Sequence, residues 1–120
     1  ARLPAGAPFL SGEVVEGEIH PGLTPLRIRG KTIKNRILST GHDTTLITTG
    51  VPNDALVAYH QARAKGGVGL IIVQASGVHD SARYTSHVLM ATDDACIPGF
   101  RRIAGKDDLV VLWPAHRGRD

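Results

Sequence analysis

The segment from Ala62 to Ala75 constrains the fold more than any other part of this 120-residue chain. It opens on the end of a helical pattern, and Gly66 and Gly67 follow where a helix C-cap needs the left-handed backbone that glycine adopts without strain. The run Val68 to Val73 is then apolar on both faces, and no polar residue interrupts it before Gln74. Strands buried on both faces are typical of parallel sheets covered by helices. The segment therefore predicts one helix–strand unit of an α/β fold.

Further predicted strands and helices alternate on both sides of this unit. Before it come a hairpin over residues 24–38 with Arg29-Gly30-Lys31 as its turn and a core strand from Asn35 to Thr40. The helix of the unit is capped by Asn53 or Asp54 and buries Ala55, Ala58, Tyr59 and Ala62, and its strand runs from Val68 to Gln74. After it come a long loop from Ala75 to Cys96, a helix beginning at Ile97 and a strand from Leu109 to Trp113. The hairpin's positive charges are interpreted as its solvated face. Strands that alternate with helices predict a parallel sheet with right-handed crossovers.

Candidate chemistry lies in the loops that leave the carboxyl ends of the strands, where α/β folds place their sites. Three loops meet this condition, at residues 40–45, 74–80 and 113–120. The first contains the polar pair His42-Asp43. The pair lies where such folds hold cofactors, which favours a binding role. A structural role, in which the two side chains only cap the loop, is an equal alternative.

Charge and residue spacing argue against several other kinds of site. The net charge is +3, and the positive residues are spread along the chain with no aromatic residue near their densest cluster, which disfavours nucleic-acid binding. The six histidines show no metal-binding spacing, and Cys96 is interpreted as a small buried apolar residue. Gly67-Val-Gly69 precedes a strand instead of following one, so it is not a dinucleotide fingerprint.

The cellular compartment is predicted from what the sequence lacks. No signal peptide is visible, and no apolar run approaches the roughly 20 residues that a membrane helix needs. The single cysteine cannot form an internal disulfide. We therefore expect a soluble, cytoplasmic protein that has no membrane partner.

Four motifs occur in order between about Leu23 and Asp120. They are Asn35-Arg-Ile, Tyr59-His-Gln-Ala-Arg-Ala-Lys-Gly-Gly-Val-Gly-Leu-Ile-Ile, Ile97-Pro-Gly-Phe and His116-Arg-Gly-Arg. Together they resemble the old yellow enzyme family, and more particularly its branch of dienoyl-CoA reductases and amine dehydrogenases. These proteins are FMN-dependent oxidoreductases built on a (β/α)8 barrel. The resemblance divides the chain into an irregular N-terminal arm, residues 1–22, and the N-terminal part of an FMN-binding (TIM) barrel, residues 23–120.

The resemblance also implies a set of FMN-binding residues, with the hairpin plugging the bottom of the barrel. They are Thr40, Gly41, His42 and Asp43 against the isoalloxazine ring, Ala75 on its pyrimidine side, and Trp113 at the end of the third strand. The family usually has glutamine where this chain has Trp113. An indole only donates hydrogen bonds, so the paired donor and acceptor of a glutamine would be lost. Relatives with a covalently bound flavin carry cysteine at the place of Asp43, so no such bond is expected here. The resemblance identifies no catalytic residue and no metal ligand.

The implied reaction transfers a hydride from NAD(P)H through FMN to an electron-poor alkene, such as an enone or an enoyl thioester. One alternative is an FMN-dependent amine dehydrogenase or N-demethylase, and another is a non-catalytic remnant or subunit that completes a partner barrel. A (β/α)8 barrel needs about 250 residues. We therefore expect the 120-residue chain to be inactive alone, to require the remainder of the barrel from the same or another chain, and to belong to an oligomer that binds a small-molecule substrate.

Overall fold

The computed structural model describes residues 20–105 and the backbone of residues 110–115. In chain order its elements are η1 (Pro21–Leu23), β1 (Leu26–Ile28), β2 (Lys31–Ile33), β3 (Leu38–Ser39), α1 (Asp54–Lys65), β4 (Leu70–Gly77), η2 (Asp80–Ala82), β5 (Leu89–Met90), η3 (Asp94–Cys96), α2 (Ile97–Ala104) and β6 (Val110–Ala115), where η marks a short 3-10 helix. Residues 1–19 of the predicted arm, Leu109 of the last predicted strand and residues 116–120 of its exit loop lie outside the described residues.

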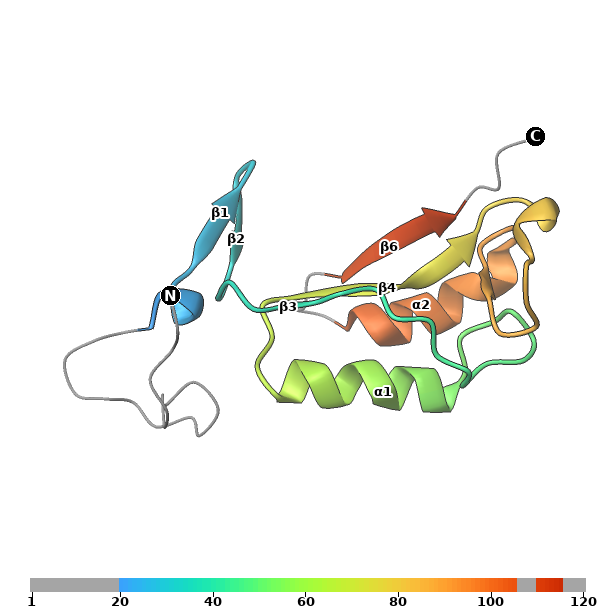
Figure 1. Cartoon of the computed structure of the whole chain (residues 1–120), viewed down its shortest axis with the longest axis horizontal. Coiled ribbons are helices and arrows are strands. Elements are labelled where there is room, and N and C mark those ends of the chain that lie inside the picture. Colours follow the sequence, from blue (N-terminus) through green and yellow to red (C-terminus); the bar gives the residue numbers. More distant parts are fainter. Residues whose placement is uncertain (1–19, 106–109, 116–120) are drawn as a thin grey trace, which may run out of the picture.

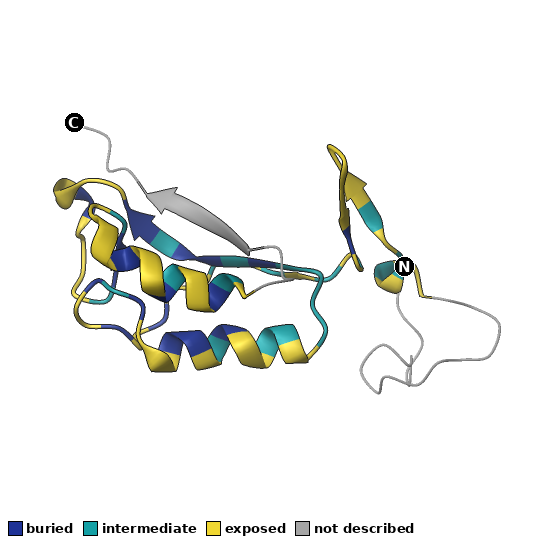
Figure 2. Ribbon diagram, turned by 180° about the vertical axis from the view of Figure 1, so that it is seen from behind, coloured by how far each residue is buried: buried dark blue, intermediate teal, exposed yellow. Residues whose placement is uncertain are grey.

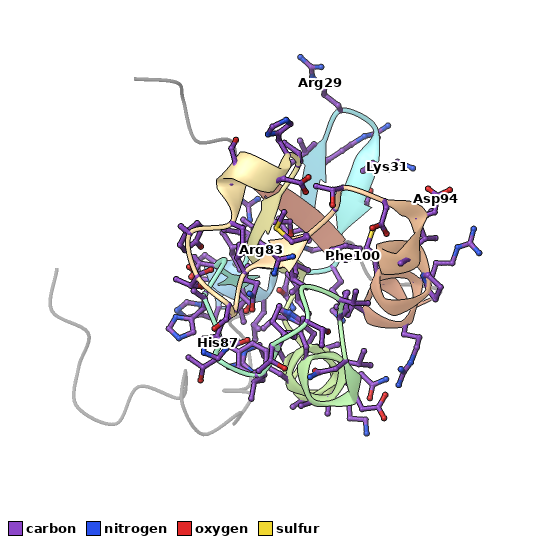
Figure 3. The ribbon with its side chains drawn as sticks, turned by 90° about the vertical axis from the view of Figure 1, so that its right-hand side faces the viewer. Arg29, Lys31, Arg83, His87, Asp94 and Phe100 are labelled. Atoms are coloured by element: carbon purple, nitrogen blue, oxygen red, sulfur yellow. The ribbon has the colours of Figure 1, made fainter. Side chains whose placement is uncertain are left out.

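The predicted hairpin is confirmed as the antiparallel pair β1–β2. Arg29 and Gly30 form its turn with φ of 42° and 78°, the positive values of the two-residue turn that matches the twist of a hairpin. Lys31 is already the first residue of β2 rather than part of the turn. Arg29 and Lys31 are exposed at the tip, as predicted for a solvated face (Figure 3).

The core strand predicted over Asn35 to Thr40 is wrong in its extent, because β3 covers only Leu38–Ser39. The amides of the two preceding residues are bonded elsewhere. The amide of Arg36 donates to the carbonyl of Gly22 at 2.8 Å, and the amide of Ile37 donates to Oδ1 of Asn35 at 3.1 Å. Hydrogen bonds of that kind replace the ladder that a longer strand would need.

Helix α1 begins where the sequence predicts, because the Asn53 side chain accepts a hydrogen bond from the Leu56 amide at 3.0 Å. The predicted buried face is wrong: Ala55, Ala58 and Ala62 are exposed, while Leu56, Val57 and His60 are buried. Alanines fit either face of a helix, so the larger apolar side chains decide its orientation. Tyr59 is half-buried, and the Arg63 guanidinium lies 3.3 Å from the centre of its ring.

At the other end of α1, only one of the two glycines has a left-handed backbone. Gly67 has φ of 93°, whereas Gly66 caps the helix in the right-handed conformation with φ of −69°. The prediction for Gly66 is therefore wrong. Within the part of the chain that the structure describes, no helix is long and apolar enough to cross a membrane.

Strand β4 is the centre of a parallel sheet, as predicted. It pairs in parallel with β3, β5 and β6. Strand β6 pairs with one edge of β4 along Ile71 to Gly77. Strands β3 and β5 therefore pair with the other edge of β4, β3 at Leu70–Ile71 and β5 at Ser76–Gly77. The sheet is open, and its described strands close no barrel.

Both ends of β4 lie later in the chain than predicted. The strand runs from Leu70 to Gly77 instead of from Val68 to Gln74, so Ala75 belongs to the strand and not to the loop after it. The predicted long loop that follows contains η2, η3 and the short strand β5. A strand of two residues has no periodicity that a sequence pattern can reveal. Helix α2 begins at Ile97 as predicted, and β6 continues past Trp113 to Ala115.

Helices α1 and α2 cover one face of the sheet, and the hairpin lies beyond the amino ends of the parallel strands (Figure 1). The core forms between sheet and helices from Ile47, Leu56, Val57, Val73, Leu89 and Ile103, with Phe100 packed against it. The helix faces turned to the sheet are buried, while their outer faces and most of the hairpin are exposed (Figure 2). Arg102 of α2 also forms an ion pair with Asp54 of α1 at 2.7 Å.

The junction between hairpin and sheet depends on close approach at Gly69. Its amide donates to the carbonyl of Ile37 at 2.9 Å, and the Asn35 side chain donates to the carbonyl of Gly67 at 2.6 Å. A Cβ atom on Gly69 would collide with the carbonyl oxygen of Asn35, and would lie 2.8 Å from Cγ2 of Ile33. No side chain fits there unless the backbone moves.

We therefore expect Gly69→Ala to destabilise the protein by about 1–3 kcal/mol, the usual range for an overpacked site. Gly66→Ala is the control, since Gly66 is already right-handed and its nearest non-neighbouring atom would lie 3.3 Å from the new Cβ. Chemical denaturation measures both variants. Equal midpoints for the two would contradict the close approach at Gly69.

Candidate functional site

The candidate site lies at the carboxyl ends of the parallel strands, at the end of the sheet that faces the viewer in Figure 3. Two segments meet there. One leaves β3 and runs from Thr40 to Asn53, and the other leaves β4 and contains η2, Arg83 and His87. The two predicted exit loops that the structure describes thus come together.

A hollow of about 270 Å³ opens at this end and is lined by Gly41, His42, Asp43 and Ala75. These are four of the six residues that the sequence predicts for the site. Thr40 is exposed and does not line the hollow. The backbone of Trp113 pairs with Ala75 across β4 and β6, and its side chain lies outside the described residues.

Ala75 reaches the hollow because β4 contains an irregularity. Against β6, Val73 pairs with Leu112 and Ala75 with Trp113, so Gln74 is an extra residue of β4. The burial pattern changes at the same point, because Val73 and Gln74 are both buried although they are neighbours. A bulge of one residue reverses the direction of every later side chain. Ala75 thereby falls on the half-buried face with Ile72.

Gln74 joins the two segments that flank the hollow, and its side chain is almost wholly buried, with 1% exposed. Its Oε1 accepts hydrogen bonds from the amide of Thr44 at 3.2 Å and from the hydroxyl of Thr44 at 2.7 Å. Its Nε2 donates to the carbonyl of His87 at 3.0 Å. This role was not predicted from the sequence. The available signal was a single amide side chain inside an apolar strand, where a polar group must find partners.

A second hydrogen bond joins the same segments at the surface. The Tyr84 hydroxyl donates to Oδ2 of Asp43 at 2.7 Å, across 41 positions of sequence. This hydrogen bond raises the pKa of Tyr84 above its ordinary 10.0, with smaller contributions from burial and from the charge of Asp43. Sequence reasoning missed Tyr84 as well, because no spacing pattern connects it to Asp43.

A smaller hollow of about 160 Å³ lies beside the first. It is lined by Asp43, Thr44, Thr45, Tyr84, Thr85, His87 and Val88. Nδ1 of His87 lies 2.7 Å from the carbonyl oxygen of Ile47, and since a carbonyl only accepts, this nitrogen is the donor of the hydrogen bond. Asp43 is the residue that both hollows share.

His60 is a buried titratable group away from this site. It is 4% exposed, and neither ring nitrogen has a hydrogen-bond partner among the residues that the structure describes. Burial, and next the positive charge of Arg63, lower the pKa of His60 below its ordinary value. The ring packs edge-on against Tyr59 with centroids 5.1 Å apart. His60 therefore belongs to the helix packing and not to the hollow.

The fold is α/β, and the hollow lies at the carboxyl ends of its parallel strands, where such folds commonly place their ligand sites. Residues 23–106 match the model of the NADH:flavin oxidoreductase / NADH oxidase family. The chain is 36% identical over 104 residues to the NADPH dehydrogenase of Bacillus subtilis, covering 80% of this chain and 30% of the relative. It is 30% identical over 87 residues to the multifunctional alkene reductase/demethylase OYE of Caballeronia cordobensis, covering 72% and 13%.

Among solved structures, the chain is similar to the old yellow enzyme from Trypanosoma cruzi, with a TM-score of 0.73 and 28% identity over 82% of this chain and 28% of that one. The chain belongs to the NADH:flavin oxidoreductase family. The predicted resemblance to old yellow enzymes is confirmed, and the chain has the fold of an N-terminal portion of their (β/α)8 barrel. It spans less than a third of the length of these relatives. The narrower resemblance to the dienoyl-CoA reductase branch stays a prediction.

Gln74→Glu tests the link between the two segments. A glutamate of the same shape cannot donate to the His87 carbonyl and leaves two buried oxygens facing each other. We expect a loss of about 1–3 kcal/mol in the free energy of unfolding, the usual cost of a buried unsatisfied group. Gln61→Glu is the matched control, because Gln61 is exposed on α1. Similar unfolding midpoints for both variants would contradict the role of Gln74.

Asp43→Asn tests the surface hydrogen bond. Removing the carboxylate is expected to lower the pKa of Tyr84 toward its ordinary value of about 10. A raised pKa in the folded state means that the contact stabilises the protein fully below that ordinary value and is lost as the pH rises through the folded pKa. An NMR titration of the tyrosine rings, with Tyr84 assigned from Tyr84→Phe, measures the shift. An unchanged pKa of Tyr84 would show that the hydroxyl does not contact Asp43 in solution.

Proposed function

We propose that the 270 Å³ hollow holds one side of the FMN ring system, and that the protein which contains this chain is an FMN-dependent NAD(P)H oxidoreductase. The observation that carries the proposal is the convergence of Gly41, His42, Asp43 and Ala75 on one hollow at the carboxyl ends of β3 and β4. Family membership supports FMN as the ligand, since the family is named for its flavin chemistry.

The residues present fit a flat aromatic ring. Gly41 has no side chain and Ala75 has only a methyl group, so the backbone of one segment and the face of β4 are accessible to a planar ligand. His42 and Asp43 are exposed and add polar groups at the rim. We propose that Thr40 and Trp113 complete this wall, Thr40 at the end of β3 and Trp113 beside Ala75.

Bound FMN would accept a hydride from NAD(P)H and pass it to an activated alkene, of which enones and enoyl thioesters are the proposed class. The chain's own residues bind and orient the ring. Gly41 and Ala75 leave room for it, while Gln74 fixes the segments on either side. The relative named NADPH dehydrogenase and the alkene reductase activity in the name of the alkene reductase/demethylase support this reaction as the first to test.

We also propose that residues 23–120 are part of a (β/α)8 barrel and that residues 1–22 precede it as an arm. The hairpin lies beyond the amino ends of the strands, which is the position of a bottom plug (Figure 1). The remainder of the barrel, from the same or another chain, would supply the other walls of the site. We also propose that the protein that contains this chain forms an oligomer.

Anaerobic reduction of the purified, FMN-loaded protein tests the reaction. NADPH or NADH is expected to bleach the flavin, and 2-cyclohexenone is expected to restore its colour. Retention of bleached flavin in the presence of the enone, or bleaching by sarcosine without a nicotinamide, would contradict alkene reduction. A protein that binds no FMN would contradict the proposed cofactor.

Ala75→Trp tests the position of the ring. An indole at residue 75 would fill the hollow, so we expect the variant to lose bound FMN while it keeps its far-ultraviolet circular dichroism. Ala58→Trp is the matched control, since Ala58 is exposed on α1 and away from the hollow. The FMN released by heat from each purified protein gives the occupancy. A yellow Ala75→Trp protein with full occupancy would remove Ala75 from the site.

A further inference from the structure

The Asp43 side chain lies at the boundary of the two hollows, so its placement decides where a negative charge sits at the candidate site. The neighbouring backbone is fixed, because Oε1 of Gln74 accepts from the amide of Thr44. The carboxylate itself is exposed and would be free to turn toward water. Among the described residues, the Tyr84 hydroxyl supplies its hydrogen bond, at 2.7 Å.

This hydrogen bond has the features of a strong one. A phenol below pH 10 is protonated and can only donate to an ionised carboxylate, and O–H donation to a charged oxygen is shorter and stronger than donation between neutral groups. The raised pKa of Tyr84 agrees with a proton held between the two oxygens. Tyr84 is brought to Asp43 by the segment after β4, whose carbonyl at His87 is bonded by Gln74.

We propose that Tyr84 is a positioning residue: its hydroxyl holds the Asp43 carboxylate at the rim of the flavin hollow, so that a fixed negative charge faces the bound cofactor. This inference rests on the proposed function. A carboxylate held at the rim of the hollow stays close to a bound ligand, whereas one that turns into bulk water is farther away and more strongly screened. Negative charge beside a flavin opposes the addition of electrons, so the pair would lower the midpoint potential of FMN.

The test uses the FMN-loaded protein and four variants: Tyr84→Phe, Asp43→Asn, their double variant, and Tyr59→Phe as the matched control on α1. Dye equilibration gives the flavin midpoint potential of each. Asp43→Asn is expected to shift the potential upward, and Tyr84→Phe is expected to shift it in the same direction. The double variant should equal Asp43→Asn alone, since without the carboxylate the hydroxyl has no charge to hold. Tyr59→Phe should leave the potential unchanged.

Two results would overturn the inference while the proposed function stands. One is a Tyr84→Phe protein that retains FMN with the wild-type potential, and the other is a double variant whose shift is the sum of the single shifts. If Tyr84→Phe does not fold, the pKa of Tyr84 in Asp43→Asn decides the matter, because an unchanged value means no contact. A wild-type protein that binds no FMN would instead overturn the proposed function, and the inference with it.

Discussion

The buried amide of Gln74 is the contact on which the candidate site depends. Its oxygen accepts from the amide of Thr44, and its nitrogen donates to the carbonyl of His87. These two backbone groups lie 43 positions apart in the chain. A buried amide oxygen or nitrogen without a partner would cost free energy. The hydrogen bonds that the buried Gln74 side chain needs therefore hold the two segments together. The hollow beside them follows from that constraint.

The bulge at Gln74 connects this contact to the lining of the hollow. An extra residue in β4 lets Gln74 turn to the buried side with Val73, and it returns Ala75 to the half-buried face. At the opposite end of the strand, the close approach at Gly69 joins β4 to the segment that follows the hairpin. Strand β4 is thus fixed at both ends, and the helices cover the face that carries the core (Figure 2).

Much of this architecture was predictable from the sequence, because it depends on signals that are local. The hairpin turn, the Asn53 cap, the parallel sheet and the helix at Ile97 each have a short pattern with a physical cause. The bulge, the two-residue β5 and the hydrogen bond from Tyr84 to Asp43 were not predictable, since each depends on residues that meet only after folding. The buried face of α1 was predicted wrongly because alanines carry little orientational information. Four residues implied by the family resemblance line one hollow, three of them in the segment after β3 and Ala75 within β4, and their role in FMN binding stays a prediction.

The most direct measurement of the central claim is a crystal structure of the purified protein with FMN bound. We predict that the flavin ring lies against Gly41, His42, Asp43 and Ala75, with Gln74 still bonded to Thr44 and His87 beneath it. A ring bound elsewhere, with this hollow left open to solvent, would show that these residues do not hold the cofactor.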